Sequence, residues 1–547
     1  MLTALLLAFL VAAVSGPLLR RVAPYGGWLA GIVPASLFVY FLNAGLGLRA
    51  DGALVESAQW VPSLGVSMSL RLDGFSWLFA LIITGVGMLV TIYAGAYFGA
   101  AAALSARFLR LILLFMCMML GAVLADDLIA MFVFWEGTSI LSFLLIGFHS
   151  ERVEARKAAL QSLLVTAGGG LALFAGVLLI GIETGTFSLS GVTAQASRLT
   201  ESAFAVPAMV LVVIGAFTKS AQFPFHFWLP AAMEAPTPAS AYLHSATMVK
   251  LGVYVLARFD AVFADVPAFG TTLIVVGSIT MLVATVRALM SDGYKAVLAQ
   301  STVASLALLV VLIGLDGELA ATAIVAFVLA HALYKASLFF CAGTAIHAMH
   351  EGRLSHLKGL GRVLPGTAVA AALAAVAMAG LPPTFAFIGK ETLLDAQLHS
   401  GGVLGLVVVG IASATFVAIA VVAGIKPYFP AASKAPRIEH AESPGLVLAS
   451  RAESGRSKTA RSSRWPTYDA PSTSCTLSGF QPNVSSQFSI VPASWPLRYS
   501  LPPCGFVLSF TFSSVKTACV HWSRANGALA TSTIGRLAAG MSSQARF

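Results

Sequence analysis

Long apolar stretches recur along most of this chain and decide what it can fold into. A transmembrane helix needs roughly 20 mainly apolar residues, and about thirteen such stretches precede residue 450. Hydrophobic residues make up 58% of the chain and charged residues only 10%, against about 25% charged residues in a soluble domain. The sequence therefore predicts an all-α polytopic membrane protein embedded in a lipid bilayer. The expected helices cover residues 2–19, 28–48, 74–97, 108–125, 128–148, 158–182, 205–229, 238–257, 270–290, 296–315, 320–347, 366–389 and 402–425.

The charges between these stretches predict how the helices are oriented. When successive helices alternate in direction, one set of connecting segments holds most of the Lys and Arg residues, beginning with Arg20, Arg21, Arg107 and Arg110. The opposite set holds mostly Asp and Glu. Because basic segments stay in the cytoplasm, we expect the N-terminus outside the cell and the region around residue 430 in the cytoplasm.

Two regions depart from the helical pattern. Apolar and polar residues alternate from Val66 to Asp73, which predicts a strand that forms half of an outer hairpin. The residues after 449 hold ten of the 33 Lys and Arg residues but only two of the 23 acids. The rest of the chain is nearly neutral, so the net charge of +10 does not indicate a nucleic-acid partner. We expect 431–547 to be a polar Ser/Arg-rich tail that is disordered or read out of frame.

Ionisable side chains occur inside several apolar stretches. The cost of burying each one in a membrane must be offset by a structural or functional role. A charged group at bilayer depth costs roughly 2.5–3.5 kcal/mol on insertion scales. A proton pathway requires such groups, because its sites must lose and regain a proton without leaving the protein. The predicted pathway residues are Glu136, Lys219, His244, Lys250, Lys295, His331, Lys335 and Lys390.

Lys219 is the first of two lysines that stand beside a proline in an apolar stretch. Pro224 is expected to break its helix, and irregular backbone in mid-membrane is tolerated only against protein or water, so the break predicts a hydrated site. Glu136 is expected to be its partner, since a nearby lysine lets both groups ionise. Lys390 follows a second expected break, at Pro382 and Pro383.

The two breaks predict two inverted repeats of about five helices each. We expect N-terminal helices over 1–107, a first repeat over 108–260 and a second repeat over 261–430.

Two histidines accompany the lysines. His331 and Lys335 are four residues apart and share a helix face, which suits a proton relay. His244 and Lys250 are six residues apart, so a proton passes between them only with help from water or a neighbouring helix.

Structural roles are the alternative for each of these residues. Lys295 and Lys390 lie near expected helix ends, where long side chains reach the membrane interface. Asp126 and Asp127 are either ion-attracting residues or ordinary loop acids. No cluster has metal-ligand spacing and no phosphate loop occurs, so neither a cofactor, a metal nor ATP hydrolysis is expected.

Two runs resemble a known family. The run from Phe134 to Phe148 resembles the fifth helix of the proton-pumping antiporter-like subunits shared by respiratory complex I and the Mrp cation/proton antiporters. The run from Gly215 to Arg258 is similar to the large A-type subunit of Mrp antiporters, and details such as Phe227 favour Mrp.

The resemblance implies a role for each matched residue. Glu136 and Lys219 match the family's modulating ion pair, and Lys390 matches the lysine of the second broken helix. The other matched residues form its central hydrophilic axis, namely His244, Lys250, Lys295, His331 and Lys335. The resemblance also implies a secondary transporter in the bacterial inner membrane, which joins other subunits of a hetero-oligomeric complex and exchanges H+ for Na+ or another monovalent cation.

Two alternative functions stay open. The first alternative is a proton-pumping subunit of complex I or of a membrane-bound hydrogenase. The second is an inactive product. The A-type subunits of the family continue into a long membrane extension, whereas here Pro444 to Ala449 is followed by Arg- and Ser-rich sequence. A frameshift near residue 449 is our hypothesis, and a genuine disordered tail is the alternative.

Overall fold

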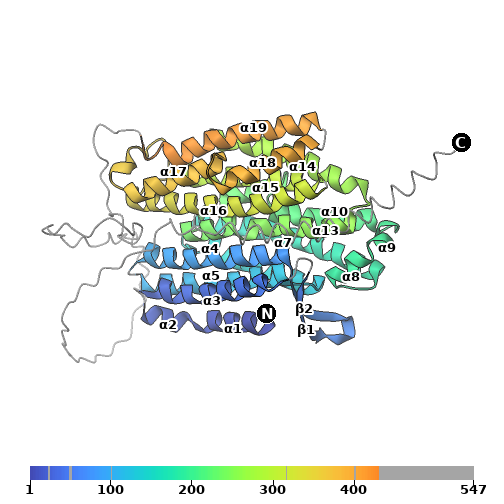
Figure 1. Ribbon diagram of the computed structural model, residues 1–547. Coiled ribbons are helices and arrows are strands. Elements are labelled where there is room, and N and C mark those ends of the chain that lie inside the picture. The colour runs from blue at the N-terminus through green and yellow to red at the C-terminus, as the bar shows by residue number, and fades with distance from the viewer. Residues whose placement is uncertain (23–24, 49–51, 100, 316, 400–401, 430–547) are drawn as a thin grey trace, which may run out of the picture.

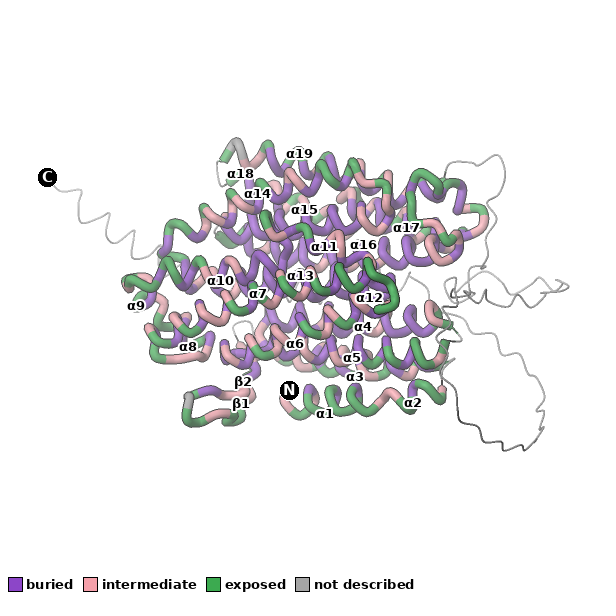
Figure 2. The backbone as a smooth tube through the Cα atoms, turned by 180° about the vertical axis from the view of Figure 1, so that it is seen from behind, coloured by how far each residue is buried: buried purple, intermediate pink, exposed green. Residues whose placement is uncertain are grey.

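The bundle is built from long apolar helices that run nearly parallel to one another (Figure 1). The computed structural model describes residues 1–22, 25–48, 52–99, 101–315, 317–399 and 402–429. The predicted tail over 431–547, with its frameshift hypothesis, lies outside the described residues. Figure 2 shows that buried residues fill the middle of the bundle and that exposed residues gather on its outer helices.

The described helices begin and end as follows: α1 (Leu2–Val14), α2 (Gly16–Arg21), α3 (Gly26–Leu46), α4 (Gly74–Phe98), α5 (Ala102–Leu124), α6 (Leu128–Ile146), α7 (Val153–Thr184), α8 (Leu189–Ala194), α9 (Ala196–Thr200), α10 (Ala205–Lys219), α11 (Trp228–Ala231), α12 (Thr237–Ser245), α13 (Met248–Phe263), α14 (Pro267–Met290), α15 (Tyr294–Ile313), α16 (Glu318–Met349), α17 (Pro365–Ala379), α18 (Phe385–His399) and α19 (Val403–Ala420). Among the described residues, 9 helices are long and apolar enough to cross a membrane. The predicted all-α polytopic fold is confirmed. The count of about thirteen spans and the two inverted repeats stay predictions.

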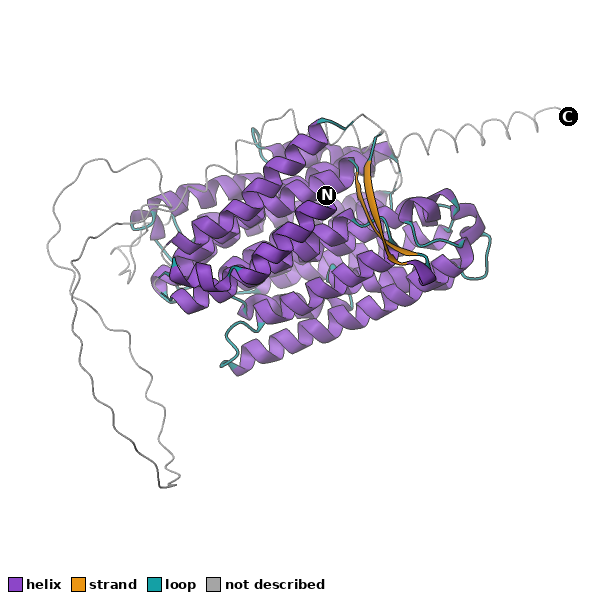
Figure 3. Cartoon of the chain, turned by 90° about the horizontal axis from the view of Figure 1, so that it is seen from below, coloured by secondary structure: helices purple, strands orange, loops and turns teal. Residues whose placement is uncertain are grey.

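A two-stranded hairpin closes one end of the bundle, beside the N-terminus (Figure 3). Strand β1 (Leu54–Val61) pairs antiparallel with β2 (Val66–Leu72), which confirms the predicted strand. The backbone N–H of Asp126, just after α5, donates to the Ser69 carbonyl at 2.9 Å. We call this the hairpin end. The opposite end, where α2 meets the start of α5 with Arg20, Arg21, Arg107 and Arg110, is the arginine end.

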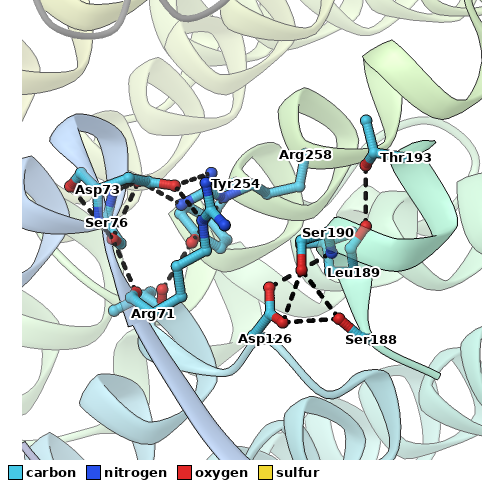
Figure 4. Close-up of polar contacts among 11 residues, drawn as sticks. Arg71, Asp73, Ser76, Asp126, Ser188, Leu189, Ser190, Thr193, Tyr254 and Arg258 are labelled. Carbon is cyan, nitrogen blue, oxygen red and sulfur yellow. Dashed lines mark hydrogen bonds and ion pairs between the residues drawn. The ribbon is translucent and has the colours of Figure 1, made fainter. Parts of the chain in front are cut away.

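Asp126 and Asp127 hold the start of α6 in place at the hairpin end. Asp127 caps α6 by accepting from the backbone N–H groups of Ile129 at 2.9 Å and Ala130 at 3.0 Å. Asp126 accepts from the hydroxyls of Ser188 at 2.8 Å and Ser190 at 2.9 Å (Figure 4). Both carboxylates are therefore used as structural acceptors.

Asp73 and Arg258 form an ion pair that joins two distant parts of the chain (Figure 4). Asp73 caps α4, where its side chain accepts from the Ser76 N–H at 3.0 Å. Arg258 of α13 donates to both oxygens of Asp73, each at 2.7 Å, and to the Tyr254 hydroxyl at 2.8 Å. Burial raises the pKa of the Asp73 carboxyl, but the Arg258 guanidinium outweighs this and holds it well below its usual range.

Two helices are interrupted near prolines. Helix α10 ends at Lys219, and the chain continues through the short turns 225–227 and 232–234 with α11 between them. Helix α17 ends where Gly380 adopts a φ of 71°, and α18 begins only after Pro382 and Pro383. Gly380 fits this position because residues with a side chain rarely adopt positive φ.

A third interruption was not predicted. We expected one helix over 238–257, but the structure has α12 and α13 with a break between Ser245 and Met248. The hydroxyl of Thr247 donates to the Tyr242 carbonyl at 2.8 Å, and that of Ser245 donates to the Ala241 carbonyl. Hydroxyl side chains that bond to nearby carbonyls compete with the helical pattern, and here they accompany a break without Pro or Gly.

Candidate functional site

Two fully buried lysines, Lys219 and Lys335, donate to serine hydroxyls. The ammonium of Lys219, at the end of α10, donates to Ser139 Oγ at 2.8 Å and to the Trp135 carbonyl at 3.2 Å, both on α6. The ammonium of Lys335 on α16 donates to Ser301 Oγ of α15 at 2.7 Å. Both lysine side chains are 0% exposed. Each ammonium is therefore held by neutral oxygens.

The other three lysines end on backbone carbonyls where helices stop. Lys250 donates to the Ser245 carbonyl at the end of α12. Lys295 donates to the Ala235 carbonyl at 2.7 Å, and Lys390 donates to the Ala379 carbonyl at 2.9 Å, at the end of α17. The last carbonyls of a helix lack intrahelical partners and carry partial negative charge. Each break thus supplies an acceptor for an ammonium inside the bundle.

Glu136 lies beside Lys219 without touching it. The two groups interact electrostatically, but they form no ion pair within 4.0 Å in the described part of the chain. Glu136 is half-buried, and its Oε1 atom has no hydrogen-bond partner among the described residues. The Lys219 ammonium instead lies 4.8 Å from the ring centre of Trp135. The modulating pair implied by the family resemblance is separated in this structure.

Two adjacent glycines, Gly169 and Gly170, let α7 approach this pair. A Cβ atom at Gly170 would overlap Glu136 Oε1, and one at Gly169 would overlap Thr218 Oγ1. A Cβ atom at Gly168 would meet no atom within 4 Å. The Glu136 carboxylate is therefore seated against the backbone of α7, at a position that only glycine leaves open.

The two predicted histidines are fully buried. His244 and His331 are both 0% exposed, and neither ring nitrogen of either residue has a hydrogen-bond partner among the described residues. The ring of Trp228 lies 6.2 Å from that of His244, and Trp228 Nε1 donates to the Thr218 carbonyl at 2.9 Å. This tryptophan therefore connects the residue next to Lys219 with His244.

Charge interactions arrange seven of the eight predicted residues in groups. Glu136 interacts with Lys219, and His244 interacts with Lys295. A third group contains Lys250, His331 and Lys335, in which His331 interacts with both lysines. No interaction of this kind joins Lys390 to the other seven in the region that the structure covers. The structure thus brings seven residues into three neighbouring groups and leaves Lys390 at the second break.

Sequence reasoning did not single out the partners of these lysines. Ser139 and Ser301 look like the other serines in apolar helices, and a backbone carbonyl has no signature in the sequence. The glycine run at Gly168 to Gly170 was a usable signal, because adjacent glycines in a helix cost stability unless another group packs closely against them.

No group of three or more His, Cys, Asp or Glu side chains could hold a metal ion within the described ranges. The two cysteines that the structure describes, Cys117 and Cys341, are both buried.

Comparisons with known proteins agree on one family. Residues 125–416 match the family model described as "NADH:quinone oxidoreductase/Mrp antiporter, TM", and residues 60–109 match "NADH-Ubiquinone oxidoreductase (complex I), chain 5 N-terminus". The chain is 41% identical over 396 residues to the A-type subunit of the Na(+)/H(+) antiporter of Alkalihalophilus pseudofirmus, covering 70% of this chain and 49% of that protein.

Two further similar proteins are an antiporter subunit and a chain of an Mrp complex. The chain is 43% identical over 375 residues to the A/B-type subunit of a probable K(+)/H(+) antiporter of Rhizobium meliloti, covering 68% of this chain and 37% of that protein. A chain in the structure of the Mrp complex from Dietzia sp. matches with 37% identity and a TM-score of 0.71, covering 76% of this chain and 46% of that one. The chain thus spans half or less of the length of these relatives.

Proposed function

This chain belongs to the transmembrane family shared by NADH:quinone oxidoreductase and the Mrp antiporters, and from that premise we propose that it is the proton-translocating subunit of a multisubunit cation/proton antiporter. The similar proteins named as Na(+)/H(+) and K(+)/H(+) antiporter subunits support a transporter rather than an enzyme. The Dietzia structure is that of an Mrp complex, which supports the presence of partner subunits.

One observation carries the proposal, namely that five lysines inside the bundle are held by neutral oxygens. Lys219 and Lys335 donate to serine hydroxyls, and the other three donate to carbonyls at helix ends. A serine hydroxyl can donate a hydrogen bond as well as accept one. It can therefore bond to the lysine nitrogen both before and after the lysine loses its proton. A lysine bound only to a carboxylate would lack this freedom, because the anion would hold the proton in place.

The proposed mechanism is charge switching between Glu136 and Lys219. When the ionised carboxylate approaches Lys219, the ammonium keeps its proton; when the two separate, the proton moves on toward His244 and Lys250. Lys295 and the pair His331 and Lys335 continue the path. Within the part of the chain that the structure describes, the ring nitrogens of both histidines lack hydrogen-bond partners. This supports the route, since a buried imidazole needs water or a proton-carrying partner.

The orientation that we propose follows the charges. Arg20, Arg21, Arg107 and Arg110 gather at the arginine end, whereas Asp73 and Asp126 lie at the hairpin end. The positive-inside rule supports an arginine end in the cytoplasm of a bacterial cell, with the N-terminus outside. Repeats over 108–260 and 261–430, with Lys219 and Lys390 at equivalent breaks, belong to the same proposal.

Everted vesicles test the exchange directly. Vesicles from cells that make the full chain with its copurifying subunits are acidified inside, and the pH gradient is followed with a fluorescent dye. We expect Na+ or K+ to dissipate the gradient and choline, a larger cation, to leave it intact. Equal responses to all three cations would contradict exchange, and comparing Na+ with K+ identifies the coupling ion.

The second candidate function is that of a proton-pumping subunit in a redox-driven complex, because the matched family also includes NADH:quinone oxidoreductase. Copurification tests it. A redox-driven pump would bring iron–sulfur or quinone-reactive subunits with the chain. An antiporter is expected to bring only other hydrophobic subunits. Visible absorbance of the purified complex that is typical of an iron–sulfur cluster would favour the pump.

The glycine run offers a sharp test of the Glu136 position. We expect Gly170→Ala to slow exchange about tenfold, because the new methyl group displaces the carboxylate and overpacking costs roughly 1–3 kcal/mol. Gly168→Ala is the matched control, since it changes the same helix two residues away and meets no atom within 4 Å. If both variants exchange ions at the wild-type rate, the seat of Glu136 has no role in transport.

A further inference from the structure

The arginine end carries a pocket that the proposed proton pathway does not use. Its volume is about 670 Å³, and it opens between α2 and the first turns of α5. Four arginines line it, two from each helix, together with small residues and Pro17. None of the lining residues is acidic. The pocket therefore concentrates four positive charges in one place.

These charges are not neutralised by the described protein. Arg20, Arg21, Arg107 and Arg110 form no ion pair with another described residue. The guanidinium of Arg107 is fixed over the ring of Phe148 at 5.0 Å. Arg110 packs against the backbone of Gly16, where an added Cβ atom would lie 3.3 Å from its Nη1 atom. Two of the four groups are thus positioned by packing, and a guanidinium fork matches phosphate oxygens in bidentate geometry.

An exposed apolar stripe leads along the helix surface to this pocket. Leu6, Leu10 and Val14 of α1, followed by Leu18 of α2, recur at four-residue spacing and are 60%, 59%, 71% and 54% exposed. Residues at this spacing share a helix face. Helix α1 lies on the outer edge of the bundle, where its surface is exposed along its length (Figure 2). A molecule with a phosphate at one end and a hydrocarbon chain at the other matches both surfaces at once.

We propose that the pocket binds the headgroup of an anionic phospholipid, with an acyl chain lying along the exposed stripe of α1 and α2. The four arginines suit a headgroup with two phosphates, such as diphosphatidylglycerol. Basic pockets beside transmembrane helices recognise such headgroups by the same chemistry. A free phosphate ion would contact the arginines but none of the apolar side chains of the stripe. The proposal rests on the membrane fold and does not depend on the proposed ion exchange.

Native mass spectrometry of the purified full chain tests the site. The delipidated protein in detergent is titrated with diphosphatidylglycerol or with phosphatidylethanolamine, and bound lipids are counted. We expect wild-type protein to prefer the anionic lipid. The double variant Arg107→Gln/Arg110→Gln is expected to weaken its binding about tenfold, since two phosphate contacts are lost.

A matched control separates the pocket from general charge. Arg156→Gln/Lys157→Gln removes the same two charges from exposed positions of α7 outside the pocket, and we expect its lipid binding to equal that of wild-type protein. Gly16→Val keeps all four arginines but crowds Arg110, so it is expected to weaken binding without changing the net charge.

Three results would overturn the proposal. Equal losses in both double variants would show that only the overall charge of this end matters. Displacement of the lipid by millimolar inorganic phosphate would assign the pocket to a soluble anion. If Arg107→Gln/Arg110→Gln folds correctly, judged by size exclusion and thermal midpoint, and binds the lipid like wild-type protein, these arginines do not bind the headgroup. If Arg107→Gln/Arg110→Gln does not fold, Arg20→Gln/Arg21→Gln tests the same pocket from α2.

Discussion

Replacing Lys219 by alanine is expected to reduce cation-driven proton movement in everted vesicles by at least about a hundredfold, which is the usual effect of losing a positioned proton-transfer group. Lys219 combines complete burial, a position at the end of α10 and contacts with Ser139 and Trp135 on α6. No other described lysine lies beside Glu136. The rate at which Na+ dissipates the pH gradient is the measurement.

Three companion variants show whether the effect comes from proton transfer. Lys358→Ala removes an exposed lysine and is expected to leave the rate unchanged. Lys219→Arg keeps a positive charge but cannot release its proton, so it should be as inactive as the alanine variant. Ser139→Ala removes one hydrogen bond to the ammonium, worth about 1.5–3 kcal/mol, and should lower the rate about tenfold or more. Wild-type exchange in Lys219→Ala would refute the mechanism.

The helices could be predicted from sequence because an apolar stretch long enough to cross a bilayer has few other stable conformations. The break between α12 and α13 could not, since it contains neither Pro nor Gly. Thr247 and Ser245 bond to nearby carbonyls there, but Thr285 does the same inside the continuous helix α14. Local sequence does not distinguish the two outcomes, which depend on packing around the segment.

The ionisable residues of the candidate site could be named from sequence, whereas their partners could not. A lysine in an apolar stretch is conspicuous because it is costly. Its acceptor is inconspicuous: Ser139 receives the Lys219 ammonium, while Ser142, one turn later, donates to its own helix at the Ser139 carbonyl. The separation of Glu136 from Lys219 was equally beyond reach, because it depends on how α6, α7 and α10 pack.

The ion pair between Asp73 and Arg258 is expected to control the stability of the hairpin end. Both side chains are only 17% exposed, and the two hydrogen bonds of 2.7 Å form a bidentate pair between α13 and the cap of α4. Breaking a buried pair leaves an uncompensated charge and costs about 3–5 kcal/mol. We expect Asp73→Asn to lower the free energy of unfolding by about 3 kcal/mol, seen as a lower thermal midpoint of the purified chain.

Matched variants separate this pair from the neighbouring charge. Arg71 also contacts Asp73, at 3.4 Å, but is 35% exposed, so Arg71→Gln should cost less than about 1 kcal/mol. Asp73→Asn/Arg258→Gln removes both charges and should recover part of the loss. If the double variant is destabilised by the sum of the effects of Asp73→Asn and Arg258→Gln measured singly, the pair has no coupling energy.

The pH dependence of unfolding gives an independent check, with a definite sign. The pKa of Asp73 is lowered in the folded chain, because the Arg258 guanidinium outweighs the opposing effect of burial. A carboxyl group of this kind contributes stability that is fully present above its unfolded pKa of about 3.9 and is lost as the pH falls toward the folded value. The gap in thermal midpoint between wild-type protein and Asp73→Asn should therefore be constant from about pH 5 to 7 and shrink below about pH 4. A gap that stays constant at acid pH would mean that the asparagine variant is destabilised by lost packing or capping and not by the loss of a charge.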